Sequence, residues 1–383
     1  MNRNYADDYL DLAAVGLVGD MMDLKSMETK ELVQLGLGRI HNPFLVGMCE
    51  KNAFSMKGAV NPFTVTFYIV PFVNAITRSG TQEEKELIFD SMLESKANNK
   101  ILSTKRGHKL GEQETILTQA LRVVTNVKKR QTDAQDASVE YLERIIAEKG
   151  LAAHKTLIIT LENNNKVEPE VRGLIANKLM AKYCRPCCIL TLRNDIYEGS
   201  ARGYEKGSVK DFKNICEQTG LIEYAQGHMS AFGLSVAKEN LAKFIETLDD
   251  ILVDFTPDSS YFVDFIYENK DIPDKDILTI ASMNDLWGQG VAEPYIAIIH
   301  LKLTKDMITL MSPGAHPTLK FSVNKIGIIK FKASQEEYEQ LIADGYVELN
   351  IIGRCAKNEW HGRISPQILV TDYEIISKCD YDF

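Results

Sequence analysis

Apolar residues near the N-terminus recur at three- and four-residue spacing, which is the period of one helix face. The members of this stripe are Leu10, Ala13, Ala14, Leu17, Val18 and Met21. The spacing predicts helix over about residues 5–40, and Asn42-Pro43 closes it because the residue before a proline disfavours helical backbone. β-Branched and aromatic residues at 64–70 predict a buried strand before Pro71.

The middle of the chain predicts a long helix followed by an α/β region. Apolar spacing favours a long helix over residues 112–150, either interrupted or wholly polar at 128–137, and this polar middle could bridge two domains. An apolar run at 157–161, a helical pattern at 169–183 and an apolar run at 187–192 follow. This order is a β-α-β unit, which predicts parallel strands.

From about residue 254 the pattern changes to short strands separated by glycine, proline and asparagine turns. Strands are predicted at residues 295–301, 319–323, 326–331 and 368–371. They indicate a small all-β barrel or sandwich. The predicted fold class is therefore α/β plus all-β.

Composition places the chain among folded proteins. It has 383 residues, of which 45% are hydrophobic and 25% charged. No apolar run approaches the roughly 18 residues of a membrane helix, and the start lacks a secretory signal. Seven cysteines without framework spacing suit a reducing compartment, so we expect a cytoplasmic protein with no membrane contact. A net charge of −9 argues against coating nucleic acid by overall basicity but leaves room for a local basic groove.

Two short segments carry candidate chemistry that has a structural alternative. Cys184 and Cys187 have C-x-x-C spacing, but no second ligand pair exists and an apolar strand follows, so buried thiols are favoured over zinc or redox chemistry. Asp20, on an apolar stretch, could be a hard-metal ligand. One carboxylate does not make a site, so a helix cap or salt bridge is favoured from the residues alone.

Two glycine-containing segments could contact a ligand. In Gly199-Ser200-Ala201-Arg202-Gly203, backbone amides, a hydroxyl and a guanidinium would suit a phosphate or chain-end oxyanion on a glycine turn. An ordinary polar loop fits these residues equally well. In Gln226-Gly227-His228 the imidazole could reach a ligand, although a lone histidine is more often structural.

Taken in order, these segments resemble the RecJ family of single-strand-specific DNA exonucleases in the DHH phosphoesterase superfamily, over nearly the whole chain. Residues 9–20 are similar to a motif whose aspartate, here Asp20, binds the catalytic metal. Residues 67–78 are similar to the next signature, which implies substrate binding by Asn74 and a catalytic position for Arg78 near the scissile phosphate.

The second half of the chain continues the resemblance. Arg172-Gly173 with Arg185-Pro186 matches the start of the DHH-associated domain. Residues 199–202 match a glycine-serine-x-arginine loop that grips the 5′ end of the strand in the family, which implies that role for Ser200 and Arg202. Three further positions receive roles from later motifs. These are Gly227 in substrate binding, His228 in catalysis and in holding the strand end, and Trp360 in substrate binding within an asparagine-glutamate-tryptophan-histidine-glycine motif.

The resemblance also implies an organisation and a function. Residues 1–110 would be the end of a DHH phosphoesterase domain, 111–153 a connecting helix, 154–252 an α/β DHH-associated domain, and 253–383 a C-terminal OB-like β-barrel. Mn²⁺ or Mg²⁺ would be the cofactor. The partner would be single-stranded DNA, hydrolysed from the 5′ end in DNA repair, recombination or replication.

One departure from the family limits that expectation. The first three metal motifs should lie before Tyr5, where no such sequence exists. A two-metal phosphodiesterase needs several ligands, so we expect this chain alone to be inactive and to be the C-terminal part of an interrupted or split enzyme. A separate N-terminal DHH half would then be a partner. Two alternatives stay open: an inactive single-stranded nucleic-acid-binding accessory protein, and a DHH-family phosphodiesterase of short oligonucleotides or cyclic dinucleotides.

Overall fold

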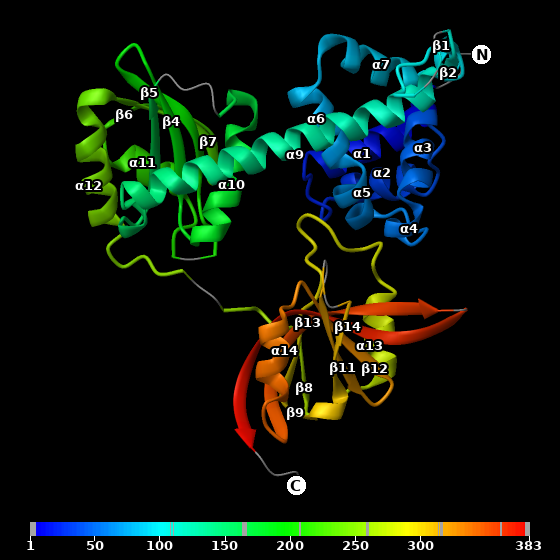
Figure 1. The fold of residues 1–383 in the computed structure, drawn as a ribbon. Coiled ribbons are helices and arrows are strands. Elements are labelled where there is room, and N and C mark those ends of the chain that lie inside the picture. The colour runs from blue at the N-terminus through cyan, green and yellow to red at the C-terminus, as the bar shows by residue number, and fades with distance from the viewer. Residues whose placement is uncertain are drawn as a thin grey trace. The chain divides into compact units, whose positions relative to one another are not determined.

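The computed structural model describes residues 5–379, except residues 108, 110, 163–166, 207, 258, 259, 313, 315, 316 and 361. The chain forms two compact units, one made of residues 1–70 with 261–383 and the other of residues 71–260 (Figure 1). His361 of the tryptophan motif lies outside the described residues. No helix in the described part is both long enough and apolar enough to cross a membrane. The four-part division of the chain stays a prediction.

The first unit begins with short helices. They are η1 (Ala6–Tyr9), α1 (Leu10–Gly19), α2 (Met27–Leu37), α3 (Pro43–Lys51), α4 (Ala53–Met56) and α5 (Pro62–Tyr68). The single helix predicted over residues 5–40 is wrong, because a turn containing Met21 at a φ of 56° separates α1 from α2. The two helices pack closely at Gly36, where a Cβ would collide with the Leu10 carbonyl oxygen.

The strand predicted at residues 64–70 is also wrong, since these residues form α5 and the start of α6 (Val70–Ser79). Asn61 and Thr64 form a reciprocal capping box, with Pro62 in the first turn of the helix. Thr64 N–H donates to Asn61 Oδ1 at 2.9 Å, and Asn61 N–H donates to Thr64 Oγ1 at 3.0 Å. These start signals outweigh the strand preference of the β-branched and aromatic residues.

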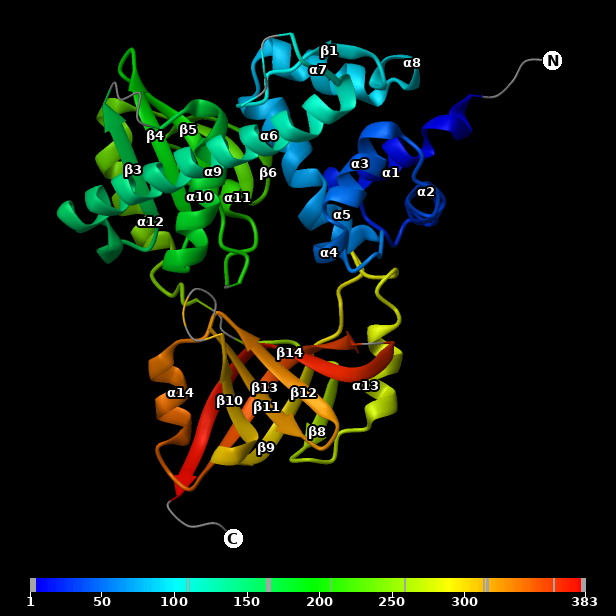
Figure 2. The ribbon, with the colours of Figure 1, turned by 45° about the vertical axis from the view of Figure 1, so that its right-hand side comes forward.

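The rest of the first unit is a seven-stranded sheet. Its strands are β8 (Phe265–Glu268), β9 (Ile296–Thr304), β10 (Ile308–Met311), β11 (Thr318–Val323), β12 (Ile326–Phe331), β13 (Tyr346–Trp360) and β14 (Arg363–Cys379). All four predicted strands are present. The order is β10-β11-β12-β14-β13-β9-β8, and in the described residues no pairing joins the two end strands (Figure 2). Helices α13 (Asp274–Ala281) and α14 (Gln335–Ile342) pack with this sheet.

The second unit opens with α6, α7 (Gln82–Met92), α8 (Glu94–Ala97), β1 (Lys100–Leu102), β2 (Gln113–Thr115) and the long helix α9 (Ile116–Glu148). The polar stretch predicted within this helix does not interrupt it. Gln131 is buried there, and its amide donates to Ser79 Oγ at 2.9 Å. Arg130 pairs with Glu84 at 2.9 Å. The polar residues therefore serve contacts with α6 and α7, and further along α9 packs against α10.

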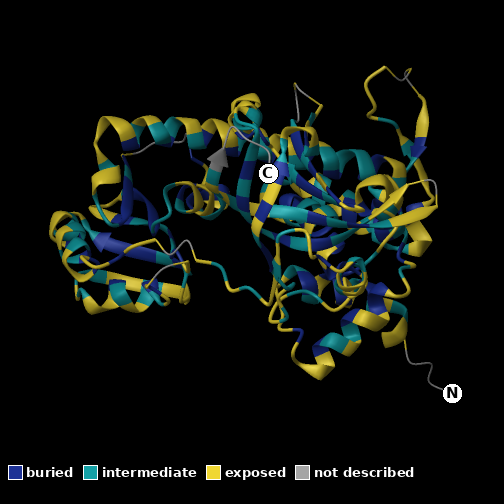
Figure 3. Cartoon of the chain, turned by 90° about the horizontal axis from the view of Figure 1, so that it is seen from below, coloured by how far each residue is buried: buried dark blue, intermediate teal, exposed yellow. Residues whose placement is uncertain are grey.

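An α/β layer completes the second unit. Its elements are β3 (Leu157–Glu162), α10 (Pro169–Tyr183), β4 (Cys187–Arg193), β5 (Ile196–Arg202), α11 (Phe212–Gln218), β6 (Ile222–His228), β7 (Ala231–Ala237) and α12 (Leu241–Ile251). The sheet order is β3-β4-β5-β7-β6, with β3 and β4 parallel as predicted. Buried residues are concentrated on the strands and on one side of the helices (Figure 3).

Two cysteines of the C-x-x-C segment behave as buried thiols, while Cys184 is half-buried. Cys187 and Cys188 are fully buried in β4, and burial raises the pKa of Cys188 to about 12. Burial likewise raises the pKa of Cys187. Thiols held in their neutral form are poor metal ligands and poor nucleophiles. This agrees with the interpretation favoured from the sequence.

Candidate nucleic-acid interface

Ser200 and Arg202 lie on a strand and not in the loop that the sequence suggested, because both belong to β5. Gly199, beside them, serves the sheet: a Cβ at this position would collide with the Ile189 carbonyl oxygen of β4. Gly199 is thus needed for the close approach of two strands. The sequence had suggested instead that it belongs to a turn. The hydroxyl and the guanidinium keep fixed positions on a rigid element.

The strand register brings the two glycine-containing segments together. Strand β7 lies between β5 and β6, and directly paired residues project to the same face of a sheet. Two cross-strand rows result, Ser200–Gly233–Gln226 and Arg202–Ala231–His228. The polar side chains of β5 and β6 therefore share one face and are separated only by small residues of β7.

That face is open over β6. On the opposite face, Ala201 and Phe232 are buried in a core that also contains Phe212 and Phe244 of α11 and α12. On the near face, α10 packs against β3 and β4, where its apolar residues join those of the strands. Gln226 and His228 are exposed. The β6 side of this face is therefore accessible to a ligand, while α10 covers the side of β4 and β5.

Two glycines shape this surface. Gly227 has a φ of 135°, and a Cβ there would lie 2.6 Å from the Ala231 carbonyl oxygen. A side chain at Gly227 would therefore distort the β6–β7 hairpin. Gly173, in the first turns of α10, lies against Arg202, because a Cβ there would collide with the guanidinium. The guanidinium thus occupies space that any larger residue at Gly173 would fill.

Arg202 has a cationic neighbour in Arg78, and Arg78 in turn has Lys128 nearby. Burial lowers the pKa of Arg202, and the positive charge of Arg78 on α6 lowers it further. Burial also lowers the pKa of Lys128 on α9, with added repulsion from Lys178 and Arg78. We refer to these four residues, Arg78, Lys128, Lys178 and Arg202, as the basic cluster. Lys128 was not among the site residues predicted from the sequence, where it lies in a polar stretch interpreted as a possible bridge between two domains.

Only one member of the basic cluster forms an ion pair within the described residues. Lys178 pairs with Asp136 at 2.7 Å. Arg202 donates at 2.7 Å to the carbonyl oxygen of the preceding residue, Ala201, and no described carboxylate lies within ion-pair distance of Arg78, Lys128 or Arg202. In a chain with a net charge of −9, three cations without acidic partners among the described residues carry uncompensated positive charge of the kind that attracts an anion.

Arg172 is a second buried guanidinium beside this surface. It is 7% exposed and donates to the Glu198 carbonyl oxygen of β5 at 3.4 Å. Its Nε has no hydrogen-bond partner among the described residues. Burial is the main cause that lowers its pKa, and the charge of Arg193 contributes. Arg172 therefore ties α10 to β5 next to Gly173.

Asn74 shares the face of α6 that carries Arg78, since the two residues are four apart on one helix. Arg78 is exposed and Asn74 half-buried. Both belong to the second unit, as do Ser200, Arg202 and the β6–β7 hairpin. Asp20 and Trp360 belong to the first unit.

Asp20 is exposed at the C-terminal end of α1, where its N–H donates to the Gly16 carbonyl oxygen at 2.9 Å. No group of three or more His, Cys, Asp or Glu side chains in the described residues could hold a metal ion. Asp20 alone does not fit a hard cation, which requires several oxygen ligands. In the described part of the chain, its carboxylate therefore lacks the companions that a metal centre needs.

Sequence reasoning missed the buried carboxylate of Asp11, which is 1% exposed. It accepts hydrogen bonds from the backbone N–H groups of Leu12 at 2.8 Å, His41 at 2.9 Å and Asn42 at 2.7 Å. Asn42 caps α3. Asp11 therefore joins α1 to the start of α3 and has a structural role.

Comparison with known proteins gives a consistent set of relatives. No family model matches the chain. It is 33% identical over 384 residues to a Bacillus subtilis (strain 168) protein provisionally named SPbeta prophage-derived single-strand DNA-specific exonuclease YorK, covering 98% of this chain and 66% of the relative. It is 23% identical to the single-stranded-DNA-specific exonuclease RecJ of the same organism, covering 96% of this chain and 44% of that protein.

Among solved structures, RecJ of Thermus thermophilus shares the fold. The complex with Mg²⁺ has a TM-score of 0.66 at 15% identity and covers 98% of this chain and 53% of that protein. The complex with Mn²⁺ has the same TM-score at 16% identity, with 98% and 50% covered. The chain thus spans between 44% and 66% of the length of these proteins.

Proposed function

We infer that this chain, a RecJ-like member of the DHH superfamily, binds the 5′ end of single-stranded DNA and contributes to its exonucleolytic hydrolysis. The observation that carries this proposal is the Arg202 guanidinium, held against Gly173 within the basic cluster without an acidic partner among the described residues. A terminal phosphate supplies the negative charge that this arrangement lacks. The relatives' names, which specify single-stranded DNA, support the choice of substrate.

The chain's own residues would divide the work of holding the strand end. Arg202 and Arg78 would donate to the phosphate oxygens, since guanidinium groups bind phosphate with two parallel N–H donors. The Ser200 hydroxyl lies on the same strand face as Arg202 and would donate to the same group. His228 faces the first sugar and phosphate across the small residues of β7, and Asn74 approaches them from α6.

Hydrolysis requires more than these residues. Mg²⁺ and Mn²⁺, present in the solved RecJ structures, supply a bound water nucleophile and neutralise the leaving oxygen in phosphodiester hydrolysis. Asp20 lacks companion ligands in the described residues, so these residues do not form a metal site by themselves. The remaining metal ligands would come from a region that the relatives have and that this chain does not match. A separate N-terminal DHH half would supply that region.

The C-terminal sheet would hold the nucleotides that follow the strand end. We propose that it is OB-like in this role, as a curved sheet that binds a strand on one face. Trp360, at the end of β13, is 71% exposed. An exposed indole provides a surface on which any base can stack.

The test compares 5′-phosphorylated and 5′-hydroxyl single-stranded DNA by fluorescence anisotropy. The native chain should prefer the phosphorylated strand, and Arg202→Gln should reduce this preference by about 10- to 100-fold, since a hydrogen bond to a charged group contributes about 1.5–3 kcal/mol. Lys238→Gln, an exposed change after β7, is the control and should bind as the native chain does. Equal binding of both strands by the native chain would contradict the proposal.

A second candidate function is strand binding without hydrolysis, favoured by the isolation of Asp20 from other ligands in the described residues. The two are separated by incubating labelled DNA with the chain in Mn²⁺, alone and with an added N-terminal DHH half. Degradation that requires the added half and Asp20 supports the enzyme. Binding without degradation in both mixtures supports the accessory protein.

A further inference from the structure

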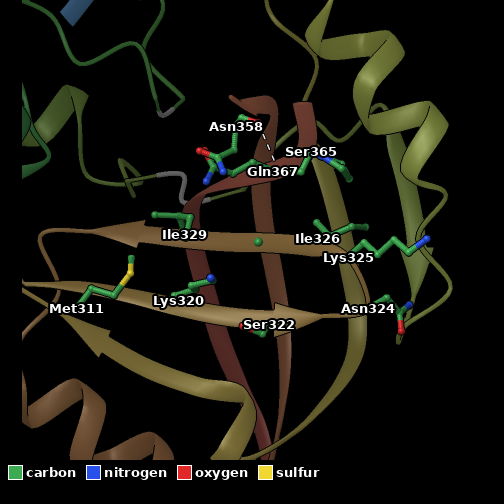
Figure 4. A pocket seen from close by; sticks show the side chains of 12 residues that line it. Met311, Lys320, Ser322, Asn324, Lys325, Ile326, Ile329, Asn358, Ser365 and Gln367 are labelled. Atoms are coloured by element: carbon green, nitrogen blue, oxygen red, sulfur yellow. Dashed lines mark hydrogen bonds between the residues drawn. The ribbon is translucent and has the colours of Figure 1, made fainter. Parts of the chain in front are cut away.

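The C-terminal sheet carries a depression of about 330 Å³ on one of its faces (Figure 4). Its twelve lining residues come from β10, β11 and β12, from the β11–β12 turn, and from the arms of the β13–β14 hairpin. We call this depression the outer groove. No role in the site described above involves its lining.

The strand register shows that the outer groove lies on the face opposite the core. Phe321 and Ile328 are paired across β11 and β12 and are fully buried in the core. Their neighbours alternate to the other face, where Lys320 pairs with Ile329 and Ser322 pairs with Gly327. This row continues through Gln367 of β14. The residues of this row therefore lie on the outer surface of the sheet, whereas Ile326, which also lines the groove, belongs to the core.

The chemistry of the lining suits an anion with an adjoining apolar part. It contains two lysines, hydroxyls and carboxamides, together with Met311 and Ile329, and has no Asp or Glu. Figure 4 shows the Lys320 side chain within the groove, while Lys325 extends away from it. Lys330, on the core side of β12, has a carboxylate partner, Glu337, at 2.9 Å. Lys320 has no ion pair among the described residues, although the chain is rich in carboxylates.

Gly327 forms the floor of the groove. A Cβ built there would lie 3.9 Å from Gln367 Nε2 and 4.0 Å from Lys320 Cε, both ordinary contact distances. Its φ lies outside the left-handed region, so a side chain would introduce no backbone strain. A glycine within a strand often marks the close approach of a ligand to the backbone. Here it leaves space between two groups that can donate hydrogen bonds.

The tip of the β13–β14 hairpin extends the same surface. Asn358 and Ser365 are paired at the edge of the groove. Trp360 follows Asn358 by two residues on β13, so both side chains project to the same face of the hairpin. The indole of Trp360 thus lies two residues along β13 from the edge of the outer groove, on the same face.

We propose that the outer groove binds one nucleotide of a single-stranded nucleic acid. The phosphate accepts hydrogen bonds from Lys320 Nζ and the Gln367 amide above Gly327, the sugar contacts the exposed Met311, and the next base stacks on Trp360. The inference rests on the proposed function and deepens it, because it names the residues that hold the strand away from its 5′ end.

The test uses the full chain and two 5′-phosphorylated oligothymidylates of about 3 and about 15 nucleotides, one shorter than the ~4–16 nucleotides of one OB-type site and one within that range. Gly327→Val fills the groove without removing a charge, and Gly327→Ala fills it partly. We expect Gly327→Val to weaken binding of the long strand about tenfold, as for loss of one charge-assisted contact, and to leave the short strand unaffected. Gly327→Ala should give a smaller loss.

A second variant tests the charge without altering the shape. Lys320→Gln should lower the salt dependence of long-strand binding by about 0.7 in slope, the value for one phosphate contact with a single strand. Lys302→Gln, an exposed lysine on β9, is the matched control and should leave the slope unchanged. Thermal melts of all variants confirm that each is folded.

The outcomes separate the groove from the 5′-end site. Unchanged long-strand binding in Gly327→Val and Lys320→Gln would overturn the outer groove while leaving the Arg202 proposal intact. Equal losses on both strands in folded variants would also overturn it. Thymidine monophosphate is then added as a competitor of the long strand. If it competes with the native chain but not with the groove variants, and binds more tightly than the long strand does per nucleotide, the groove is a site for free nucleotides and the strand proposal fails.

Discussion

Gly173→Ala tests the placement of Arg202 without changing any charge. A Cβ at Gly173 would collide with the guanidinium of Arg202, and the three atoms nearest to it all belong to that side chain. The end of an arginine side chain moves at little cost, so the guanidinium would shift and α10 would not. The substitution therefore displaces the anion-binding group and leaves the backbone of α10 and β5 in place.

The expected effects on binding and on stability have opposite signs. A displaced guanidinium loses up to one of two charge-assisted hydrogen bonds to phosphate, worth about 1.5–3 kcal/mol, or about a 10- to 100-fold loss of 5′-phosphate preference. Alanine in a helix is favoured over glycine by up to about 1 kcal/mol. Gly173→Ala should therefore bind the phosphorylated end more weakly while unfolding at an equal or higher urea concentration.

The assay pairs anisotropy on 5′-phosphorylated and 5′-hydroxyl strands with urea denaturation of the same samples. Asn177→Ala, an exposed position four residues further along α10, is the matched control, since it raises helix propensity without approaching Arg202. It should stabilise the chain and leave binding unchanged. A folded Gly173→Ala variant with native 5′-phosphate preference would refute the argument that Arg202 acts from its place over α10.

Three further predictions concern buried and paired groups. Hydrogen bonds from Arg122 hold the pKa of Glu114 at about 2, below its ordinary value of 4.5. The stabilisation by this pair is therefore complete above pH 4.5 and is lost as the pH falls toward 2. Glu114→Gln should remove this acid dependence from the urea midpoint of unfolding. Asp11→Asn leaves a backbone donor of its cluster unsatisfied and should cost about 1–3 kcal/mol in urea unfolding, and a change below about 0.5 kcal/mol would contradict this. A hydrogen bond to the Arg39 carbonyl is the main cause that raises the pKa of His41 from 6.5, so its contribution is complete below pH 6.5 and declines as pH rises through the folded value; His41→Gln should flatten stability over that range, and an unchanged profile would exclude the effect.

Elements made of continuous apolar runs were predictable, because burial on both faces leaves a clear pattern. The parallel pair β3 and β4 follows this rule. The strands of the C-terminal sheet alternate buried and open positions, and their β-branched residues between turn residues made them predictable. The strand prediction failed at α5 because the capping box of Asn61 and Thr64 starts a helix in residues that otherwise favour strands. The turn at Met21 was missed because the apolar spacing continues into it.

The candidate site was predictable in its chemical groups but not in its arrangement. The sequence identifies Ser200, Arg202 and His228 as candidates, yet it does not show which strands are neighbours. Only the insertion of β7 between β5 and β6 places the three on one face. Lys128 lacked any sequence signal, since it comes from a polar helix stretch interpreted as a possible bridge between two domains and reaches the basic cluster through tertiary packing.

The two proposed binding surfaces share one physical design, and this design explains why small residues recur in them. In the second unit, Gly233 and Ala231 separate polar side chains on the open face of the sheet. In the first unit, Gly327 does the same between Lys320 and Gln367. A strand position without a large side chain costs stability, because it buries less apolar surface and packs poorly with its neighbours. That cost is offset if a phosphate fills the space and meets cations that have no other partner in the described residues. Filling either space with a larger side chain should therefore weaken strand binding even where every charged residue is retained, which distinguishes a shaped phosphate site from general electrostatic attraction.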